Sequence, residues 1–308
     1  MKNVLDLIII GAGPSGVSAA IYAKRANIDF IIFEKYIIGG QVVNAFEIEN
    51  YPGFSKINGS DLALNFINQL SSLNIDVKYE EIVSLNKEDD LFILQSNIGN
   101  VYYAKNVILA LGSNPRKLEV ERADEFTGRG ISYCAMCDGN FYKDKEVVVV
   151  GGGNSAISES LFLKNIVKKL TIVSRSKLRA EPTLINELLS SSKVCLLENK
   201  LVDSLIIKDN KINGIVIKDK LNGEISEIST DGIFVYIGAN PSTKNFLNLN
   251  VFNKEGYIEV NNHYETNING LYAIGDVLMK DLKQIVTATS DGANVIHYLL
   301  HNLQNSKK

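Results

Sequence analysis

Apolar runs that end in glycine turns recur along the chain and predict strands followed by helices. Residues 5–26, LDLIIIGAGPSGVSAAIYAKRA, contain a short apolar strand, a glycine turn and a helix, and residues 145–166, KEVVVVGGGNSAISESLFLKNI, repeat this order. The strands are rich in β-branched residues, which is typical of central parallel strands covered on both faces. The chain therefore contains two copies of one strand-turn-helix unit.

Each copy ends in a further apolar segment, and the two segments resemble each other. These are residues 106–115, NVILALGSNP, and residues 232–241, GIFVYIGANP, in which an apolar strand runs into a Gly-x-Asn-Pro turn. Two internal repeats of this kind predict an α/β fold with two doubly wound, Rossmann-like nucleotide-binding domains.

The C-terminal segment is expected to belong to the first domain. Residues 270–280, GLYAIGDVLMK, predict a buried strand that ends at Gly275-Asp276, and residues 284–303 predict a helix with apolar residues at helical spacing. A strand end followed by a helix N-terminus is well placed to reach a cofactor in the first domain. The first domain is therefore predicted to comprise 1–115 and 244–308, with 116–243 inserted as the second.

Both glycine turns match the dinucleotide-binding fingerprint. Its first glycine makes the tight turn, its second admits a pyrophosphate, and its third position is small so that the helix packs on the strand. The pyrophosphate is then held by free N–H groups at the helix N-terminus. A single match can be a turn that binds nothing, but here both copies have the required strand and helix. The matching positions are Gly11, Gly13 and Gly16 in the first copy and Gly151, Gly153 and Ala156 in the second.

The residue at the end of the second strand of each unit predicts which dinucleotide binds. Glu34 stands there in the first unit and can accept hydrogen bonds from a ribose diol, which suits FAD or NAD. The second unit has no acid at this point; Arg175 stands there and Arg179 follows. Arginines suit a 2′-phosphate and hence NADP, and two merely solvated side chains are the alternative.

The composition is that of a globular protein, with 45% hydrophobic residues, 22% charged residues and a net charge of −3. No long basic tract is present, so neither nucleic acid nor an anionic membrane is expected as a partner. The apolar run near the N-terminus is too short to span a membrane and no cleavage site follows it. We therefore expect a cytoplasmic protein. Three cysteines in 308 residues do not make a secreted disulfide framework.

Two of the cysteines, Cys134 and Cys137, are separated by two residues, and Asp138 follows directly. This spacing suits a zinc knuckle, a redox disulfide or a plain turn. A structural zinc site needs four ligands, and no second close cysteine pair accompanies the remaining cysteine and the three histidines, so no metal is expected. Cys195, in the strand-like KVCLL, is expected to be buried.

A redox role explains more of this motif. A C-x-x-C turn keeps two sulfurs close enough to bond while exposing one of them, which suits electron delivery from a flavin. Each thiol attacks as a thiolate, so neighbours that change its pKa control its reactivity. Asp138 could exchange a proton with the leaving thiolate as a general acid, or it could be a solvated turn aspartate.

Six motifs occur in a specific order: GAGPSG (11–16), GGQ (39–41), EIENYPGF (47–54), CAMCDG (134–139), GGGNSA (151–156) and AIGDV (273–277). Over essentially the whole chain they resemble the bacterial-type, low-molecular-weight thioredoxin reductases of the class II pyridine nucleotide-disulfide oxidoreductase family. The resemblance implies FAD and NADPH domains, a homodimer, and electron flow from NADPH through FAD and a Cys134–Cys137 disulfide to thioredoxin. It also implies that Cys137 faces the flavin, that Cys134 attacks the thioredoxin disulfide, and that the domains rotate about junctions near 113–117 and 240–244.

The same resemblance implies the cofactor contacts. The FAD would be lined by Ser15, Glu34, Gly40, Gln41, Asn50, Val83, Gly112, Asp276, Gln284 and Ile285, beside the first fingerprint. The nicotinamide nucleotide would be held by Gly151, Gly153, Asn154, Ser155, Ala156, Arg175 and Arg179.

Two departures from the family pattern concern the electron donor. Val173 and Ser174 replace the first two residues of the family's His-Arg-Arg-x-x-x-Arg motif, and Lys283-Gln284 replaces the usual Arg-Gln pair. A reductase of the same fold that uses ferredoxin or another donor is therefore one alternative. A flavin-dependent dithiol oxidase is a second, which the intact second fingerprint disfavours, and a flavin-binding sensor without enzymatic activity is a third.

Overall fold

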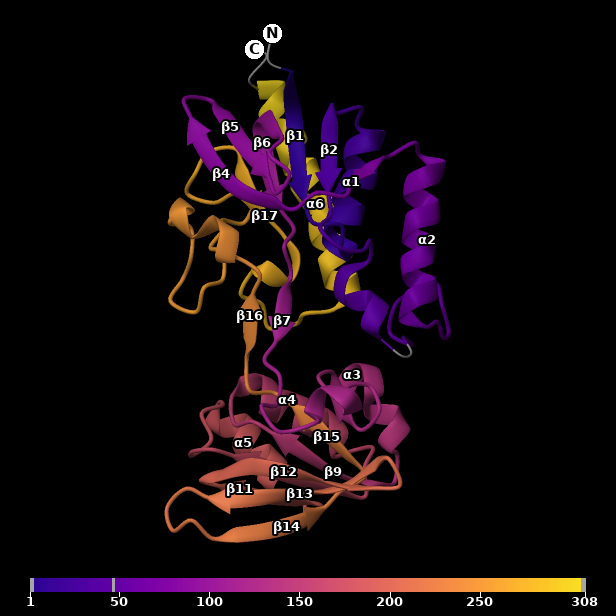
Figure 1. Cartoon of the computed structure of the whole chain (residues 1–308), viewed down its shortest axis with the longest axis vertical. Coiled ribbons are helices and arrows are strands. Elements are labelled where there is room, and N and C mark those ends of the chain that lie inside the picture. The colour runs from indigo at the N-terminus through magenta and orange to yellow at the C-terminus, as the bar shows by residue number, and fades with distance from the viewer. Residues whose placement is uncertain (1–2, 46–47, 306–308) are drawn as a thin grey trace. The chain divides into compact units, whose positions relative to one another are not determined.

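The computed structural model describes residues 3–45 and 48–305, which divide into two compact units (Figure 1). The first unit contains residues 3–45, 51–114 and 240–305, and the second contains residues 48–50 and 115–239. The chain leaves the first unit near residue 114 and returns near residue 240, so the second unit is inserted into the first. The expected domain boundaries at 115/116 and 243/244 lie close to these crossings and stay a prediction.

A seven-stranded mixed sheet forms the centre of the first unit, in the order β3-β2-β1-β6-β5-β4, with β17 paired to β6. On one side, β6 has two successive neighbours: β5 pairs with its first half, and β17 pairs with its last three residues. The parallel strands are β1 (Val4–Ile10), β2 (Phe30–Phe33), β3 (Val77–Lys78), β6 (Val101–Leu109) and β17 (Leu271–Ala273). The antiparallel strands are β4 (Ile82–Glu88) and β5 (Leu91–Ser96).

Three helices of the first unit are α1 (Pro14–Arg25), α2 (Gly59–Ser72) and α6 (Ile285–Asn305). Helices α1 and α6 pack closely because Gly292 carries no side chain: a Cβ there would lie 2.3 Å from the carbonyl oxygen of Ser15. The predicted C-terminal helix is confirmed as α6, whereas the strand before it ends at Ala273 rather than at Gly275-Asp276. The 3-10 turns of this unit are η1 (Gly40–Asn44), η4 (Lys244–Leu249) and η5 (Gly275–Val277).

The second unit is built on a five-stranded parallel sheet in the order β11-β10-β9-β15-β8. Its strands are β8 (Ile131–Ser132), β9 (Glu146–Val150), β10 (Lys169–Ser174), β11 (Val194–Glu198) and β15 (Gly232–Val235). Its helices are α3 (Ala135–Asp138), α4 (Asn154–Leu163) and α5 (Pro182–Leu189), with 3-10 turns η2 (Ala123–Phe126) and η3 (Gly139–Tyr142). A separate antiparallel sheet contains β12 (Lys200–Lys208), β13 (Lys211–Asp219) and β14 (Ile225–Ser229).

The apolar runs of both repeats form the predicted buried strands. Leu7, Ile8 and Ile9 of β1 are completely buried, and so are Val148 and Val149 of β9. Side chains that point to both faces of these strands are therefore covered, as the continuous apolar runs predicted. The mixed α/β fold with two doubly wound, Rossmann-like sheets agrees with the expected fold class.

The expected burial of Cys195 is wrong, because its side chain is exposed. Strand β11 is the edge strand of its sheet, and only half-buried or exposed side chains occur along it. An edge strand has a neighbour on one side only, so a short apolar run in it does not ensure burial.

Both chain crossings between the units are short strands. β7 (Ser113–Pro115) and β16 (Ala239–Pro241) form a two-stranded sheet with each other, and each contains an Asn-Pro pair. Proline fixes φ and cannot donate a backbone hydrogen bond, so these crossings are stiff at the residue that ends each strand. Among residues 3–45 and 48–305, no helix has both the length and the apolar character of a membrane span.

Candidate active site

The first glycine fingerprint is a tight strand-to-helix turn between β1 and α1. Gly11 has a positive φ of 105°, and a Cβ there would lie 2.4 Å from the carbonyl oxygen of Ala110. A Cβ at Gly16 would lie 1.8 Å from the carbonyl oxygen of Gly11. Gly13, by contrast, precedes α1 with extended backbone, and a Cβ there would meet no atom within 4 Å. The outer two glycines are thus required by packing, and the middle one leaves open space at the N-terminus of α1.

Glu34 follows β2 and holds the fingerprint turn in place. Its Oε2 accepts a 2.8 Å hydrogen bond from the backbone nitrogen of Ala12, and its Oε1 accepts a 2.9 Å bond from that of Tyr36. Each carboxylate oxygen has a second lone pair, so Glu34 can still accept hydrogen bonds from a ribose diol. The acid that sequence spacing selected therefore lies against the turn.

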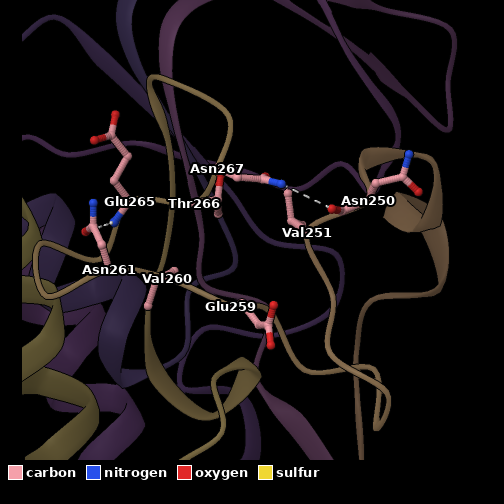
Figure 2. A pocket seen from close by; sticks show the side chains of 8 residues that line it. All are labelled: Asn250, Val251, Glu259, Val260, Asn261, Glu265, Thr266 and Asn267. Atoms are coloured by element: carbon pink, nitrogen blue, oxygen red, sulfur yellow. Dashed lines mark hydrogen bonds between the residues drawn. The ribbon is translucent and has the colours of Figure 1, made fainter.

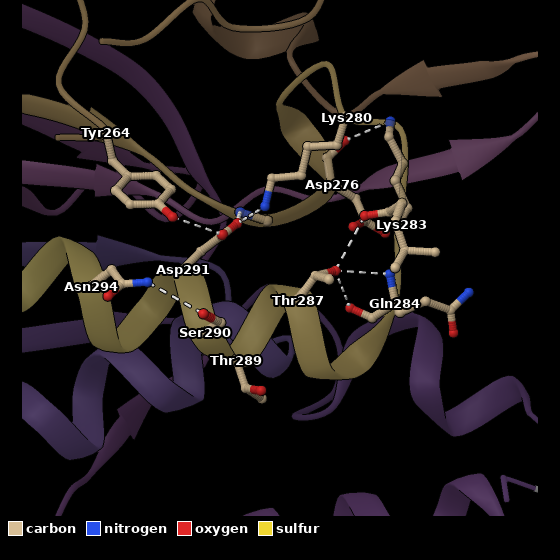
Figure 3. A network of polar contacts seen from close by, with 12 residues as sticks. Tyr264, Asp276, Lys280, Lys283, Gln284, Thr287, Thr289, Ser290, Asp291 and Asn294 are labelled. Atoms are coloured by element: carbon tan, nitrogen blue, oxygen red, sulfur yellow. Dashed lines mark hydrogen bonds and ion pairs between the residues drawn. The ribbon is translucent and has the colours of Figure 1, made fainter. Parts of the chain in front are cut away.

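The turn at Gly275-Asp276 meets the same fingerprint. A Cβ at Gly275 would lie 2.6 Å from Ser15 Oγ. The buried carboxylate of Asp291, on α6, fixes this turn by accepting a 2.8 Å hydrogen bond from the Gly275 nitrogen (Figure 3). Asp291 also pairs with Lys280 and accepts a 3.1 Å bond from Tyr264 Oη. This network was not anticipated from the sequence, although Asp291 inside an otherwise apolar helical stripe was a signal.

Asp276 and the following residues form a partly buried polar end of this turn. Burial raises the pKa of Asp276, and the nearby Lys283 and Lys280 oppose that shift. Burial lowers the pKa of Lys283, which donates a 3.1 Å hydrogen bond to the carbonyl oxygen of Asp276 and lies 4.0 Å above the ring of Tyr257. The Gln284 nitrogen donates to Thr287 Oγ1, at 3.1 Å, where α6 begins at Ile285 (Figure 3).

The remaining residues expected around FAD are less closely grouped. Gly40 begins η1, and a Cβ there would lie 3.4 Å from Gly13 Cα. Gln41 Nε2 donates a 2.5 Å hydrogen bond to Asn114 Oδ1 at the first crossing. Gly112 precedes β7 with a positive φ of 67°, Val83 is partly exposed on β4, and Asn50 is exposed in the segment that clusters with the second unit.

The second fingerprint joins β9 to α4 with the same geometry. Gly151 has a positive φ of 147°, and a Cβ there would lie 2.3 Å from the carbonyl oxygen of Tyr236. Gly153 again precedes the helix with extended backbone and open space, and Ala156 is buried against the sheet. Asn154 and Ser155 open the first turn of α4, and Asn154 Oδ1 accepts a 3.2 Å hydrogen bond from the Glu181 nitrogen.

The two arginines lie on the loop after β10. The Arg179 nitrogen donates a 2.7 Å hydrogen bond to the carbonyl oxygen of Gly152, which ties this loop to the fingerprint. Both arginine side chains are exposed, and within the part of the chain that the structure describes neither forms an ion pair. Glu198, which sequence reasoning missed, lies beside Ser174 on the neighbouring strand and accepts a 2.9 Å bond from the Leu178 nitrogen. The loop is therefore fixed through its backbone while Arg175 and Arg179 are available to a ligand.

Cys134 and Cys137 form a disulfide with Sγ atoms 2.18 Å apart and Cα atoms 5.3 Å apart. Cys134 precedes the short helix α3, and the Cys137 nitrogen donates a 3.2 Å hydrogen bond to Cys134 Sγ. This backbone donor favours negative charge on Cys134 when the bond is broken.

Asp138 lies behind the disulfide in a half-buried position. Its Oδ2 accepts a 2.6 Å hydrogen bond from Ser132 Oγ, which in turn accepts a 3.1 Å bond from the Cys134 nitrogen. Burial raises the pKa of Asp138, and the hydrogen bond from Ser132 opposes that shift. The raised pKa makes Asp138 better suited to take up and give a proton than a freely solvated turn aspartate is.

Two cavities of the structure lie away from the residues expected in the site. One of about 370 Å³ is lined by polar and apolar residues between Asn250 and Asn267 (Figure 2). None of the residues expected to bind a cofactor or to carry out redox chemistry lines it. The described residues contain no cluster of three metal-binding side chains either.

Comparisons with known proteins agree with this arrangement. The pyridine nucleotide-disulphide oxidoreductase family matches residues 5–292. The thioredoxin reductase of Bacillus subtilis is 40% identical over 100% of this chain and 98% of its own, and that of Mycoplasma pneumoniae is 42% identical over 94% and 92%. The crystal structure of thioredoxin reductase from Streptococcus pyogenes matches with a TM-score of 0.89 and 37% identity over 99% of this chain and 100% of its own. The chain therefore belongs to the pyridine nucleotide-disulphide oxidoreductase family, within its low-molecular-weight thioredoxin reductases.

Proposed function

We propose that the protein passes electrons from NADPH, through FAD and the Cys134–Cys137 disulfide, to thioredoxin or a thioredoxin-like protein. Enzymes of this family are FAD-binding disulfide reductases that depend on NADPH. The observation that carries the proposal is the formed disulfide beside a half-buried acid in the unit that contains the second fingerprint. It is tested by NADPH oxidation that depends on added oxidised thioredoxin.

The residues around the first fingerprint fit FAD. The open space at Gly13 admits a pyrophosphate to the N-terminus of α1, and Glu34 retains acceptors for a ribose. Asp291 binds the Gly275 nitrogen and so fixes the turn at Gly275-Asp276 beside the fingerprint. When bound, FAD supplies a two-electron carrier between the nucleotide and the disulfide.

At the disulfide, the protein's own residues provide the remaining chemistry. Reduction breaks the S–S bond with two electrons and leaves two sulfurs, of which one takes up a proton. The Cys137 amide favours the thiolate on Cys134, which attacks the thioredoxin disulfide and forms a mixed disulfide. Cys137 then attacks Cys134, which re-forms the internal bond and releases reduced thioredoxin. Asp138 supplies the proton to the departing thiolate.

Asp138→Asn should separate activity from stability. Loss of a general acid lowers turnover with thioredoxin by about 10²-fold or more.

Because burial raises the pKa of Asp138 in the folded state, the protonated carboxyl stabilises the fold at low pH, and this contribution is lost as the pH rises through the folded-state pKa. Near neutral pH the neutral asparagine should therefore cost no stability, and the wild type should gain relative to the variant on acidification. Turnover and thermal unfolding at several pH values check both parts; equal turnover would contradict the acid role.

Gly13→Val and Gly153→Val should produce reciprocal ligand losses. Both positions have extended backbone and no atom within 4 Å of a Cβ, so valine fits the fold but occupies the space of a pyrophosphate. Gly13→Val should be purified colourless, whereas Gly153→Val should be yellow but no longer reduced by NADPH. Flavin absorbance and NADPH-dependent bleaching distinguish the two. A colourless wild type that cannot be reconstituted with FAD would contradict the assignment.

NADPH is proposed as the donor because the second fingerprint has the geometry of the first and two exposed arginines lie on the loop tied to it. We further propose a homodimer, on the resemblance to the family, and a cytoplasmic location, since only three cysteines are present and two of them form a dithiol that must cycle. Light scattering tests the homodimer, and cell fractionation tests the location.

A further inference from the structure

Two polar side chains outside the C-x-x-C motif contact the backbone between its cysteines. Tyr236 lies one residue beyond β15, and its Oη accepts a 2.5 Å hydrogen bond from the Ala135 nitrogen. Tyr236 Oη in turn lies 3.4 Å from Glu159 Oε2, on α4. The donor and acceptor assignment follows from the amide, which can only donate, so the phenol donates to the carboxylate.

The pKa shifts of Tyr236 and Glu159 agree with a phenol that donates to the carboxylate. Burial raises the pKa of Tyr236 well above its ordinary value, so the phenol keeps its proton. Burial also raises the pKa of Glu159, while its hydrogen bond with Tyr236 and the nearby Met136 and Ala135 amides oppose that shift. Glu159 thus holds the phenol of Tyr236 in place and is not a solvated helix residue.

Each of four backbone amides around the disulfide donates to a different acceptor. The Cys134 nitrogen donates to Ser132 Oγ, that of Ala135 to Tyr236, and that of Cys137 to Cys134 Sγ. The Asp138 nitrogen donates to the carbonyl oxygen of Cys134. Of these four amides, that of Cys137 reaches a sulfur, and its direction depends on how α3 is held.

We propose that Tyr236 and Glu159 are positioning residues of the dithiol: Tyr236 binds the Ala135 amide at the start of α3, Glu159 holds the phenol, and together they keep the Cys137 amide directed at Cys134 Sγ. The pair therefore stabilises the reduced form, because reduction by two electrons leaves a thiolate on Cys134 that this amide binds. Since Glu159 belongs to the helix that follows the second fingerprint, the same contact joins the nucleotide-binding helix to the redox motif. This inference rests on the redox role of the disulfide but on neither NADPH nor thioredoxin.

The test is a redox equilibrium of the FAD-loaded protein in glutathione buffers, with the Cys134 and Cys137 thiols quantified by alkylation and peptide mass spectrometry. Tyr236→Phe removes one neutral hydrogen bond and should shift the equilibrium toward the disulfide about three- to tenfold. Glu159→Leu should shift the equilibrium in the same direction. Glu159→Gln keeps an oxygen acceptor, so in this variant the reduced form should be at least as favoured as in the wild type. Alkylation of the reduced Cys134 thiolate at neutral pH should slow by a similar factor in Tyr236→Phe and Glu159→Leu.

Tyr142→Phe is the matched control. Tyr142 is also partly buried near the motif, and burial with the nearby Asp138 and Asp231 raises its pKa to about 12. Within the described part of the chain, its hydroxyl makes no hydrogen bond to α3. Exposed Cys195 serves as an internal reference for alkylation. The proposal is overturned if Tyr236→Phe stays within twofold of wild type, or if Tyr142→Phe shifts the equilibrium as much as Tyr236→Phe does. If the variants shift the redox equilibrium as expected but the wild type does not reduce thioredoxin, the proposed function alone is contradicted.

Discussion

Cys134→Ser and Cys137→Ser should each reduce thioredoxin turnover to background while leaving the flavin reducible by its donor. The two sulfurs are bonded in the structure, and electron transfer to a protein disulfide requires both of them in one cycle. With one sulfur missing, the internal disulfide cannot re-form, so at most one mixed disulfide per chain can accumulate. The residues proposed to hold FAD do not include either cysteine, so the flavin should still bind and accept electrons.

The measurement for this first prediction is steady-state thioredoxin reduction together with anaerobic bleaching of the flavin. Cys195→Ser is the control, because Cys195 is exposed on an edge strand and takes no part in the disulfide. It should retain wild-type turnover. Wild-type turnover in either Cys134→Ser or Cys137→Ser would make the disulfide structural and the mechanism wrong.

Arg175→Ala combined with Arg179→Ala should raise the KM for NADPH about a hundredfold or more and leave the KM for NADH nearly unchanged. Each charge-assisted contact to a phosphate contributes roughly 1.5–3 kcal/mol, and the 2′-phosphate is the group that distinguishes the two nucleotides. Val173 and Ser174 do not compensate, since they are buried and Ser174 Oγ donates to the Ser176 carbonyl oxygen.

Lys177→Ala is the control for this second prediction, because Lys177 is exposed on the same loop between the two arginines. It should change the two KM values equally and only slightly. A double variant that uses NADPH as well as the wild type would show that these arginines do not contact the phosphate. A wild-type flavin that ignores both nucleotides but is bleached by reduced ferredoxin would favour the ferredoxin alternative.

The parts of the fold that the sequence predicted are those encoded by local pattern. A buried parallel strand, a glycine turn and a helix occupy one continuous segment, so β1-α1 and β9-α4 could be identified from residues that are neighbours in the chain. The same holds for the Cys134–Cys137 pair and for Glu34, whose distance from the fingerprint is fixed by one helix and one strand.

The features that were missed depend on contacts between distant segments. Tyr236 meets Ala135 across 101 residues and Glu159 across 77, and neither contact has a local signature. The antiparallel sheet of β12, β13 and β14 was likewise not predicted from the sequence. Cys195 was placed in the core because a short apolar run does not show whether its strand lies at an edge.

The most direct test of the electron path is an anaerobic cycle on the wild-type protein. Oxidised protein is mixed with NADPH, the flavin absorbance is followed, and the thiols are trapped by alkylation before and after oxidised thioredoxin is added. The account predicts bleaching of the flavin, free thiols on Cys134 and Cys137, and reversal of both changes when thioredoxin becomes reduced. A bleached flavin with the Cys134–Cys137 bond intact throughout, or reduced thiols that thioredoxin leaves unchanged, would contradict it.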